Sequence, residues 1–263
     1  MATVREIAAS FEQRVPTSMK MDFDNPGFLV GNGDTEVTKV LFSLDITDEV
    51  IAEAKEVGAQ LIMSHHPLFF SVKDANTETL IGRKIVAMLS AGISCICLHT
   101  NLDAVVGGVN DALMAVLGIP MEGILEPYGE YVDGKPYGMG RYGYVSERSL
   151  QDFLPQVKTA LNCNGLRYIS GGKPVHKVAV CGGSGSSLLE EVNALGCDTF
   201  ITGDVKHNGF LDARDMEINL IDAGHFSTEN VVIPVLEQML RQDFPGTETY
   251  ISQVHTQPEQ YYV

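Results

Sequence analysis

The amino-acid sequence predicts an α/β fold in which helices flank a parallel or largely parallel sheet. Apolar strand-like runs alternate with helical patterns over residues 37–118, and the alternation resumes after residue 150. The stretch between the two regions, residues 127–141, is instead rich in Gly, Tyr and Pro and predicts a crossover between two halves. A chain of 263 residues is long enough to bury a substantial core, as one large domain or two smaller ones.

In the first half, each expected element has a start or stop signal. Thr47 is a helix N-cap, and Gly58 ends the helix that follows it. Residues 1–15 predict a short amphipathic helix, with Val4, Ile7, Ala8 and Phe11 at helical spacing. The remaining expectations are strands at 37–44, 60–63 and 93–98, a helix at 80–89 ending at Gly92, and a helix at 109–117 capped by Gly118.

The second half repeats the rhythm with shorter elements. Helices are expected at 150–161, 188–195 and 207–213, and strands at 178–181, 199–202 and 218–221. A long helical pattern covers residues 228–241, and Pro234 inside it either kinks the helix or marks its true start.

Composition narrows the class of protein. The chain has 34 acidic and 18 basic side chains, a net charge of −16, which disfavours binding to nucleic acid and to anionic membranes. No apolar stretch approaches the roughly 20 residues of a membrane helix, and the N-terminus lacks a signal-peptide pattern. The five cysteines are odd in number and lie mostly in apolar runs, which favours buried, reduced thiols and a cytoplasmic protein.

Polar clusters follow four of the predicted strands. Ligands of open α/β sheets bind at the C-terminal ends of the strands, so these clusters can converge on one cleft. The clusters are Ser64-His65-His66-Pro67, His99-Thr100-Asn101-Leu102-Asp103, Thr202-Gly203-Asp204 with His207, and Asp222-Ala223-Gly224-His225 with Glu229.

The side chains in these clusters are typical of a site for divalent metals. Imidazole and carboxylate are the usual ligands of zinc, manganese, iron, cobalt and nickel. His225 and Glu229 are spaced i, i+4 and share one helix face. Adjacent side chains of a strand point in opposite directions, so His65 and His66 reach two neighbouring ions unless the chain turns there. Asp103 or Glu229 can bridge two ions about 3.5–4 Å apart.

Each feature also has a structural interpretation. A His-His pair is more often structural than ligating, and His99 can be a strand-end histidine bonded to a backbone carbonyl. Asp103 can cap a turn, and His225 with Glu229 can be a solvated helix start. We interpret His176 and His255 as surface residues without partners. It is the joint occurrence of the clusters at strand ends that favours the metal site.

A glycine-rich turn, Cys181 to Ser187, follows one strand and precedes a helix. Its backbone amides can cradle a phosphate, but it lacks the Gly-Lys-Ser/Thr of a P-loop and the third glycine of a dinucleotide fingerprint. A tight strand-to-helix turn is the favoured interpretation of Gly182 to Gly185.

These motifs resemble the signature of the NIF-three-like dinuclear metal-centre proteins, also named type 2 homologues of GTP cyclohydrolase I. The resemblance spans nearly the whole chain in the expected order. It is carried by Ser64-His65-His66-Pro67-Leu68, His99 to Asp103, Thr202-Gly203-Asp204 and His225 with Glu229, together with Asp24-Asn25, Gly31, Leu44 to Thr47 and the glycine turn.

The resemblance implies a protein of two α/β domains with a metal cleft. The first domain is expected to cover residues 1–126 and to be completed by 223–263, and the second to cover 127–222. It implies two divalent metal ions per subunit and a homohexamer built as a trimer of dimers. By motif position the metal ligands are His65, His66, Asp103, His225 and Glu229, with His99 near the centre.

The leading functional hypothesis is a metal-dependent hydrolase, of cyclohydrolase or phosphoester type, acting on a small, nucleotide-like substrate. His99 and His207 are the candidates for moving protons. A second hypothesis is a non-enzymatic ring-shaped protein whose metals serve structure, regulation or interaction. A nucleotide-dependent oxidoreductase, suggested by the glycine turn, is the third.

Overall fold

The computed structural model describes residues 1–131 and 133–262, and it divides the chain into two compact units. The first unit contains residues 1–102 and 233–256, and the second contains residues 103–232 and the segment from Gln257 onward. The chain therefore changes unit at 102/103, 232/233 and 256/257, whereas the domain boundaries expected from the resemblance were 126/127 and 222/223. Those domain boundaries stay a prediction.

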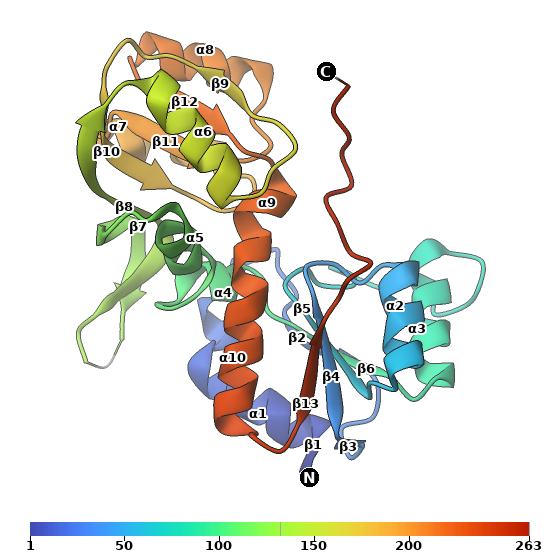
Figure 1. The fold of residues 1–263 in the computed structure, drawn as a ribbon. Coiled ribbons are helices and arrows are strands. Elements are labelled where there is room, and N and C mark those ends of the chain that lie inside the picture. Colours follow the sequence, from blue (N-terminus) through green and yellow to red (C-terminus); the bar gives the residue numbers. More distant parts are fainter. Residues whose placement is uncertain (132, 263) are drawn as a thin grey trace. The chain divides into compact units, whose positions relative to one another are not determined.

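The first unit is built on a five-stranded sheet with the order β13-β4-β5-β6-β2. β13, β4, β5 and β6 run parallel, and β2 pairs antiparallel with β6 at the edge. The parallel strands end at the same edge of the sheet, which places the residues that follow them close together (Figure 1). The bounds are β2 Gly27–Val30, β4 Lys39–Ser43, β5 Leu61–Ser64, β6 Ser94–Cys97 and β13 Glu248–Ile251; β1 (Ala2–Thr3) and β3 (Glu36–Val37) form a separate pair.

Helices cover this sheet and bury its apolar side chains. α2 and α3 pack on one face, where Ile51 and Met88 join a core with Leu41, Ile62 and Cys95. α1 and α10 lie together elsewhere in the unit, and Arg14 and Ser10 of α1 both bond Asp243 of α10. The bounds are α1 Val4–Arg14, η1 Thr17–Met19, α2 Asp48–Val57, α3 Leu80–Ser90 and α10 Ile233–Asp243.

The predicted caps of α2 are confirmed. The Val50 amide donates to Thr47 Oγ1 over 3.2 Å, and Gly58 ends the helix with φ of +73°. That left-handed conformation is accessible to glycine without the steric cost a Cβ would bring.

The second unit contains a six-stranded sheet with the order β7-β8-β10-β11-β12-β9. β10, β11 and β12 are parallel in the centre, and antiparallel strands flank them on both sides. The bounds are β7 Met121–Glu130, β8 Pro136–Arg148, β9 Arg167–Ile169, β10 Val175–Val180, β11 Thr199–Thr202 and β12 Asn219–Asp222.

One face of this sheet is covered by α5 and α6, which share a core with the central strands. Leu113 and Phe153 from the helices pack there with Val178, Ile201 and Ile221. The helices of this unit are α4 Thr100–Ala104, α5 Val109–Leu117, α6 Leu150–Ala160, η2 Ser186–Leu188, α7 Leu189–Ala194, α8 His207–Asp215, α9 His225–Glu229 and η3 Asn230–Val232; α4 begins in the first unit.

The crossover predicted for residues 127–141 is wrong. Residues 127–130 and 136–141 lie in an antiparallel hairpin of the long strands β7 and β8. Two glycines of β7 make room for tyrosine rings on the opposite strand. A Cβ on Gly123 would come within 2.8 Å of the Tyr142 ring, and one on Gly129 would come within 2.8 Å of Tyr137. Glycine shielded by a cross-strand aromatic ring is compatible with strand structure.

The helical pattern at 228–241 is three elements rather than one. α9 ends at Glu229, η3 follows, and α10 begins at Ile233 with Pro234 as its second residue. Pro234 therefore marks the true start of the last helix. In the first turn of a helix the backbone N–H groups have no helical acceptor, so proline, which lacks this N–H, loses no hydrogen bond there.

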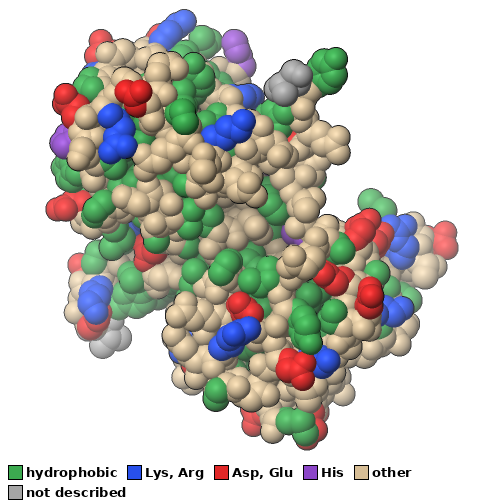
Figure 2. Space-filling model, in the orientation of Figure 1, with side chains coloured by type: hydrophobic (Ala, Val, Ile, Leu, Met, Phe, Trp, Pro, Cys, Tyr) green, Lys and Arg blue, Asp and Glu red, His purple; other side chains and the backbone are tan. Residues whose placement is uncertain are grey.

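All five cysteines are buried and free, as their place in apolar runs of the sequence predicted. Acidic and hydrophobic side chains both occur on the face drawn in Figure 2. Within the described residues no helix is long and apolar enough to span a membrane.

Candidate metal centre

Two adjacent histidines follow β5 in the first unit. β5 ends at Ser64, and the chain turns there because the His66 amide donates to the Leu44 carbonyl over 2.9 Å and Ser64 Oγ donates to the His66 carbonyl over 2.8 Å. The alternation of a strand no longer applies past this point. The rings of His65 and His66 consequently lie on the same side, with centroids 5.0 Å apart.

His99 joins this pair from the end of the neighbouring strand, β6. Its ring centroid lies 5.2 Å from that of His65 and 5.5 Å from that of His66. One potential ligand atom from each ring lies within 4.8 Å of the others. The first unit thus gathers three imidazoles into a group able to hold a metal ion.

Every histidine of this group has its Nδ1 atom held by an oxygen. His65 Nδ1 lies 2.8 Å from the Leu98 carbonyl, His66 Nδ1 lies 2.7 Å from Asp45 Oδ1, and His99 Nδ1 lies 2.8 Å from Asp24 Oδ1. An Nδ1–H that donates to such an oxygen places the lone pair of the ring on Nε2, which is then the nitrogen suited to bind a metal. The partners therefore fix both ring orientation and tautomer.

The two carboxylates that hold these rings are ionised. Burial by itself raises the pKa of Asp24, but the hydrogen bonds from His99 and Thr100 outweigh it and hold that pKa well below its usual range. Burial likewise raises the pKa of Asp45, and the hydrogen bonds from His255 and His66 bring it well below its usual range. Each remains an acceptor at neutral pH.

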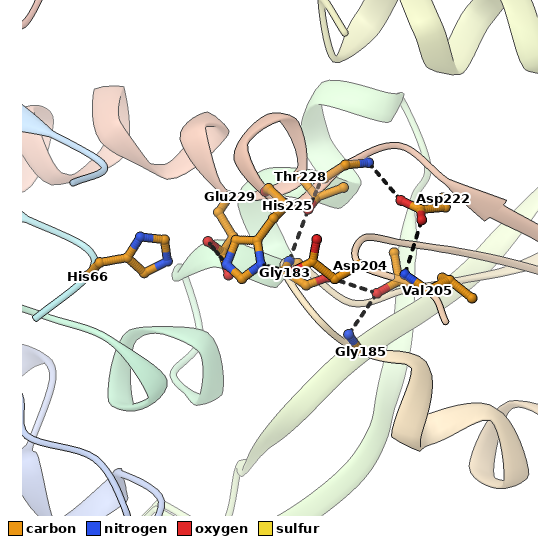
Figure 3. A network of polar contacts seen from close by, with 12 residues as sticks. His66, Gly183, Gly185, Asp204, Val205, Asp222, His225, Thr228 and Glu229 are labelled. Atoms are coloured by element: carbon orange, nitrogen blue, oxygen red, sulfur yellow. Dashed lines mark hydrogen bonds and ion pairs between the residues drawn. The ribbon is translucent and has the colours of Figure 1, made fainter. Parts of the chain in front are cut away.

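The second unit presents a histidine and a glutamate on one short helix. His225 begins α9, which follows β12, and Glu229 ends it. His225 Nδ1 lies 2.7 Å from Asp204 Oδ2, and His225 Nε2 lies 3.0 Å from Glu229 Oε2 (Figure 3). Asp204 comes from the end of β11 and plays the same part for His225 as Asp24 and Asp45 play in the first unit.

The glycine-rich turn passes close to this pair. Its amides are engaged by protein groups: Gly182 donates to Asn110 Oδ1, Gly183 to Thr228 Oγ1 and Gly185 to Thr202 Oγ1, over 3.0, 3.0 and 2.9 Å. Figure 3 shows Gly183 beside His225 and Glu229. These three amides are therefore committed to folding the turn and to fixing α9, which supports the tight-turn interpretation over a phosphate cradle.

Asp103 lies in α4 and is buried, and its surroundings are tightly fixed. Its carbonyl accepts from Asn110 Nδ2 over 3.0 Å, and the fully buried Arg141 donates to the Val105 carbonyl over 3.1 Å. Burial, together with the charges of Asp103 and Glu229, raises the pKa of the Cys181 thiol. A buried carboxylate at this position suits cation binding.

The remaining histidines fall in different environments. His207 is exposed at the start of α8. His176 lies on the surface, as predicted, but it does have a partner, because its Nδ1 lies 2.7 Å from the Val145 carbonyl. The interpretation of His255 as a surface residue without partners is wrong. Only 9% of its side chain is exposed, and its Nε2 lies 2.9 Å from Asp45 Oδ2.

Reasoning from residue spacing missed the carboxylates that hold the histidines. The sequence singled out Asp24 and Asp45 only through the family resemblance, and Asp204 only through a polar cluster and that resemblance. Their partners are 75, 21 and 21 residues away. No periodic pattern connects residues at such separations.

Known proteins resemble this chain in sequence over nearly its whole length. The sequence profile described as Duf34/NIF3 (NGG1p interacting factor 3) matches residues 2–258. This chain is a member of the Duf34/NIF3 family. A Clostridium perfringens relative named "GTP cyclohydrolase 1 type 2 homolog" is 35% identical over 259 residues, covering 97% of this chain and 98% of the relative. A Clostridium acetobutylicum relative of the same name is 36% identical over 240 residues, covering 90% and 89%.

Solved structures resemble this Duf34/NIF3 chain over nearly its whole length. A hypothetical protein of Staphylococcus aureus has a TM-score of 0.90 at 29% identity, and a Bacillus cereus protein related to NIF3 has a TM-score of 0.89 at 25% identity. Both comparisons cover 99% of each chain. The α/β fold expected from the sequence is confirmed.

The donor groups are chemically suited to a transition metal. In proteins, zinc, manganese and related ions are bound by carboxylates and by imidazoles whose other ring nitrogen donates to an oxygen. The first unit offers three imidazoles, two of them held by carboxylates and one by a backbone carbonyl, and the second offers an imidazole with a carboxylate 3.0 Å away. The residues present therefore fit a divalent metal ion.

Proposed function

We propose that His65 and His66 of the first unit and Asp103, His225 and Glu229 of the second complete one site for two divalent metal ions. The covalent chain supports this pairing. The backbone changes unit between residues 102 and 103, next to Asp103, and again at 232/233, three residues after Glu229. Asp103 thus lies in the sequence next to the first of these crossings, and His225 and Glu229 lie a few residues before the second.

Metal content is the direct test of this proposal. Protein purified without chelator should contain close to two equivalents of zinc, manganese, iron, cobalt or nickel by mass spectrometry of the elements. His66→Ala should lose at least one equivalent. His176→Ala, which removes an exposed histidine outside the candidate groups, is the matched control and should retain both. Wild-type protein that takes up no transition metal would contradict the proposal.

We further propose that the chain is a metal-dependent hydrolase. Bound divalent ions supply Lewis acidity, which polarises a substrate oxygen and raises the acidity of water. The protein's own part is to orient the ligands through Asp45, Asp204 and the Leu98 carbonyl. His99, with Nδ1 held by ionised Asp24, can accept a proton at Nε2 and pass it on. His207 is the weaker candidate because it is exposed at the start of α8.

A small molecule with a planar ring fits the surroundings of His99. Phe70 is 55% exposed with its ring centroid 5.9 Å from that of His99, and Phe23 is 63% exposed with its ring 6.0 Å from that of Phe70. Large exposed aromatic side chains gathered at one place are typical of binding surfaces. This aromatic pair supports a nucleotide-like substrate of cyclohydrolase or phosphoester type.

Turnover decides between an enzyme and a non-enzymatic metal protein. Metal-loaded protein should act on at least one member of a panel of nucleotides and phosphoesters, with His66→Ala as the inactive control. Turnover no higher than that of His66→Ala would favour the alternative, in which the metals serve structure, regulation or interaction. A coordination sphere closed by protein ligands, seen by X-ray absorption, would point the same way.

We also propose that the protein is a cytoplasmic homohexamer, a trimer of dimers. The five buried free thiols support a reducing compartment, and the exposed Phe28 and Leu80 offer apolar surface for contacts between copies. Light scattering after size-exclusion chromatography should give six times the chain mass of 28.6 kDa. A monomer at micromolar concentration would overturn the hexamer.

A further inference from the structure

The C-terminal segment of the first unit brings a histidine onto the carboxylate that holds His66. His255 Nε2 lies 2.9 Å from Asp45 Oδ2, while His66 Nδ1 lies 2.7 Å from the other oxygen, Asp45 Oδ1. The two imidazoles thus occupy opposite oxygens of one carboxylate. His255 is 210 residues from Asp45 in sequence and 9% exposed in its side chain.

Either tautomer of His255 has a partner on Asp45. A protonated Nε2 donates to the carboxylate, and an unprotonated Nε2 accepts from the Asp45 amide, which lies 3.2 Å away. Rotation about the Cα–Cβ bond of Asp45 is the one side-chain torsion that would swing its carboxylate away from His66. The hydrogen bond from a protonated Nε2 to the distant oxygen, Asp45 Oδ2, restricts that torsion.

The segment carrying His255 is itself anchored. After β13, Ser252 Oγ donates to Glu53 Oε2 of α2 over 2.5 Å, and the Gln253 amide donates to Glu53 Oε1 over 2.9 Å. The His255 amide then donates to Ser252 Oγ over 3.2 Å. Hydrogen bonds to α2 therefore set the position of His255. An accidental surface contact would lack such an anchor.

From this chain of contacts we propose that His255 is a positioning residue, which fixes Asp45 so that Asp45 fixes the ring of His66. The carboxylate–histidine unit is the common means of orienting a metal-binding imidazole. His255 adds a further support behind it, supplied by the C-terminal segment. The inference rests on the proposed function, because it takes His66 to be a metal ligand.

Cobalt binding tests this role with a readout that general stability does not move. Co²⁺ is titrated into metal-free His255→Leu, His255→Gln, His66→Ala and His176→Leu, and both affinity and the visible absorption spectrum are recorded. His255→Leu should bind Co²⁺ about 10-fold more weakly, the lower end of the range for loss of such a support, with a shifted spectrum. His255→Gln, which keeps a donor, should recover most of the affinity, and His176→Leu should match wild type.

The outcomes separate the two proposals. Wild-type affinity and spectrum in His255→Leu, alongside weakened binding in His66→Ala, would overturn the positioning role and leave the metal site standing. Unchanged binding in His66→Ala would overturn both. If His255→Leu does not fold, Ser252→Ala replaces it. That variant removes the anchor of His255, and it should weaken Co²⁺ binding by a smaller factor; an unchanged affinity and spectrum would overturn the positioning role.

Discussion

A Cβ atom on Gly183 would lie 2.1 Å from Oε1 of Glu229 and 3.2 Å from Nε2 of His225. Gly183 also has φ of +65°, a conformation that costs other residues about 1–2 kcal/mol. The glycine turn is therefore shaped by the space that the candidate metal-binding pair of the second unit needs.

Gly183→Ala should displace the Glu229 carboxylate and lower the metal content by at least one equivalent. Gly196→Ala is a matched control in the same unit, because Gly196 has φ of +67° but nothing within 4 Å of an added Cβ. Both variants should lose about 1–2 kcal/mol of stability from backbone strain. Elemental analysis and thermal unfolding separate the effects, and equal metal content in the two variants would contradict the prediction.

Asp204→Asn should weaken metal binding by about 10-fold, because the neutral amide holds His225 Nδ1 less firmly than the carboxylate. Asparagine tolerates the positive φ of 53° at this position, so the backbone is not strained further. Calorimetric titration with Mn²⁺ measures the change. Asp215→Asn, which alters an exposed carboxylate of α8, serves as the control, and an equal loss there would sink the interpretation.

Arg141→Leu should destabilise the protein by about 3–5 kcal/mol, because it removes a fully buried guanidinium and leaves the partly buried Asp111 without its ion pair. The Val105 carbonyl, just beyond Asp103, would also lose its donor. Urea unfolding measures the loss. Arg5→Leu, which breaks an exposed ion pair with Asp34, should change stability by less than about 1 kcal/mol. Comparable losses in both variants would contradict the prediction.

Burial raises the pKa of the Cys197 thiol from 9.0 to about 11. The thiol should therefore resist alkylation by iodoacetamide at pH 8 in the folded protein and react quickly in urea. The stability gained by keeping it neutral is complete below about pH 8 and falls as pH rises from 9 toward 11, because the unfolded chain ionises first. Peptide mass spectrometry follows the reaction, and rapid labelling of folded protein at pH 8 would refute this.

Local sequence determined the elements whose signals lie within a few residues. The Thr47 cap, the Gly58 stop and the helix ending at Gly118 were all predictable, because capping and helical spacing are short-range effects. The His-His, His-to-Asp and His-x-x-x-Glu clusters were likewise visible as candidate metal ligands at strand ends. The family resemblance then supplied their joint assignment.

Tertiary structure decided what depends on distant partners. The edge strands β2, β9 and β13 form because a neighbouring strand pairs with them, and the glycines of β7 and β8 are tolerated because tyrosines cover them. Asp24, Asp45 and His255 meet their histidine or carboxylate partners only in the folded protein. Asp24 and His99 are 75 residues apart in the sequence, Asp45 and His255 are 210 apart, and Asp45 and His66 are 21 apart. A hydrogen bond between such residues leaves no period in the sequence, and folding alone brings the groups together.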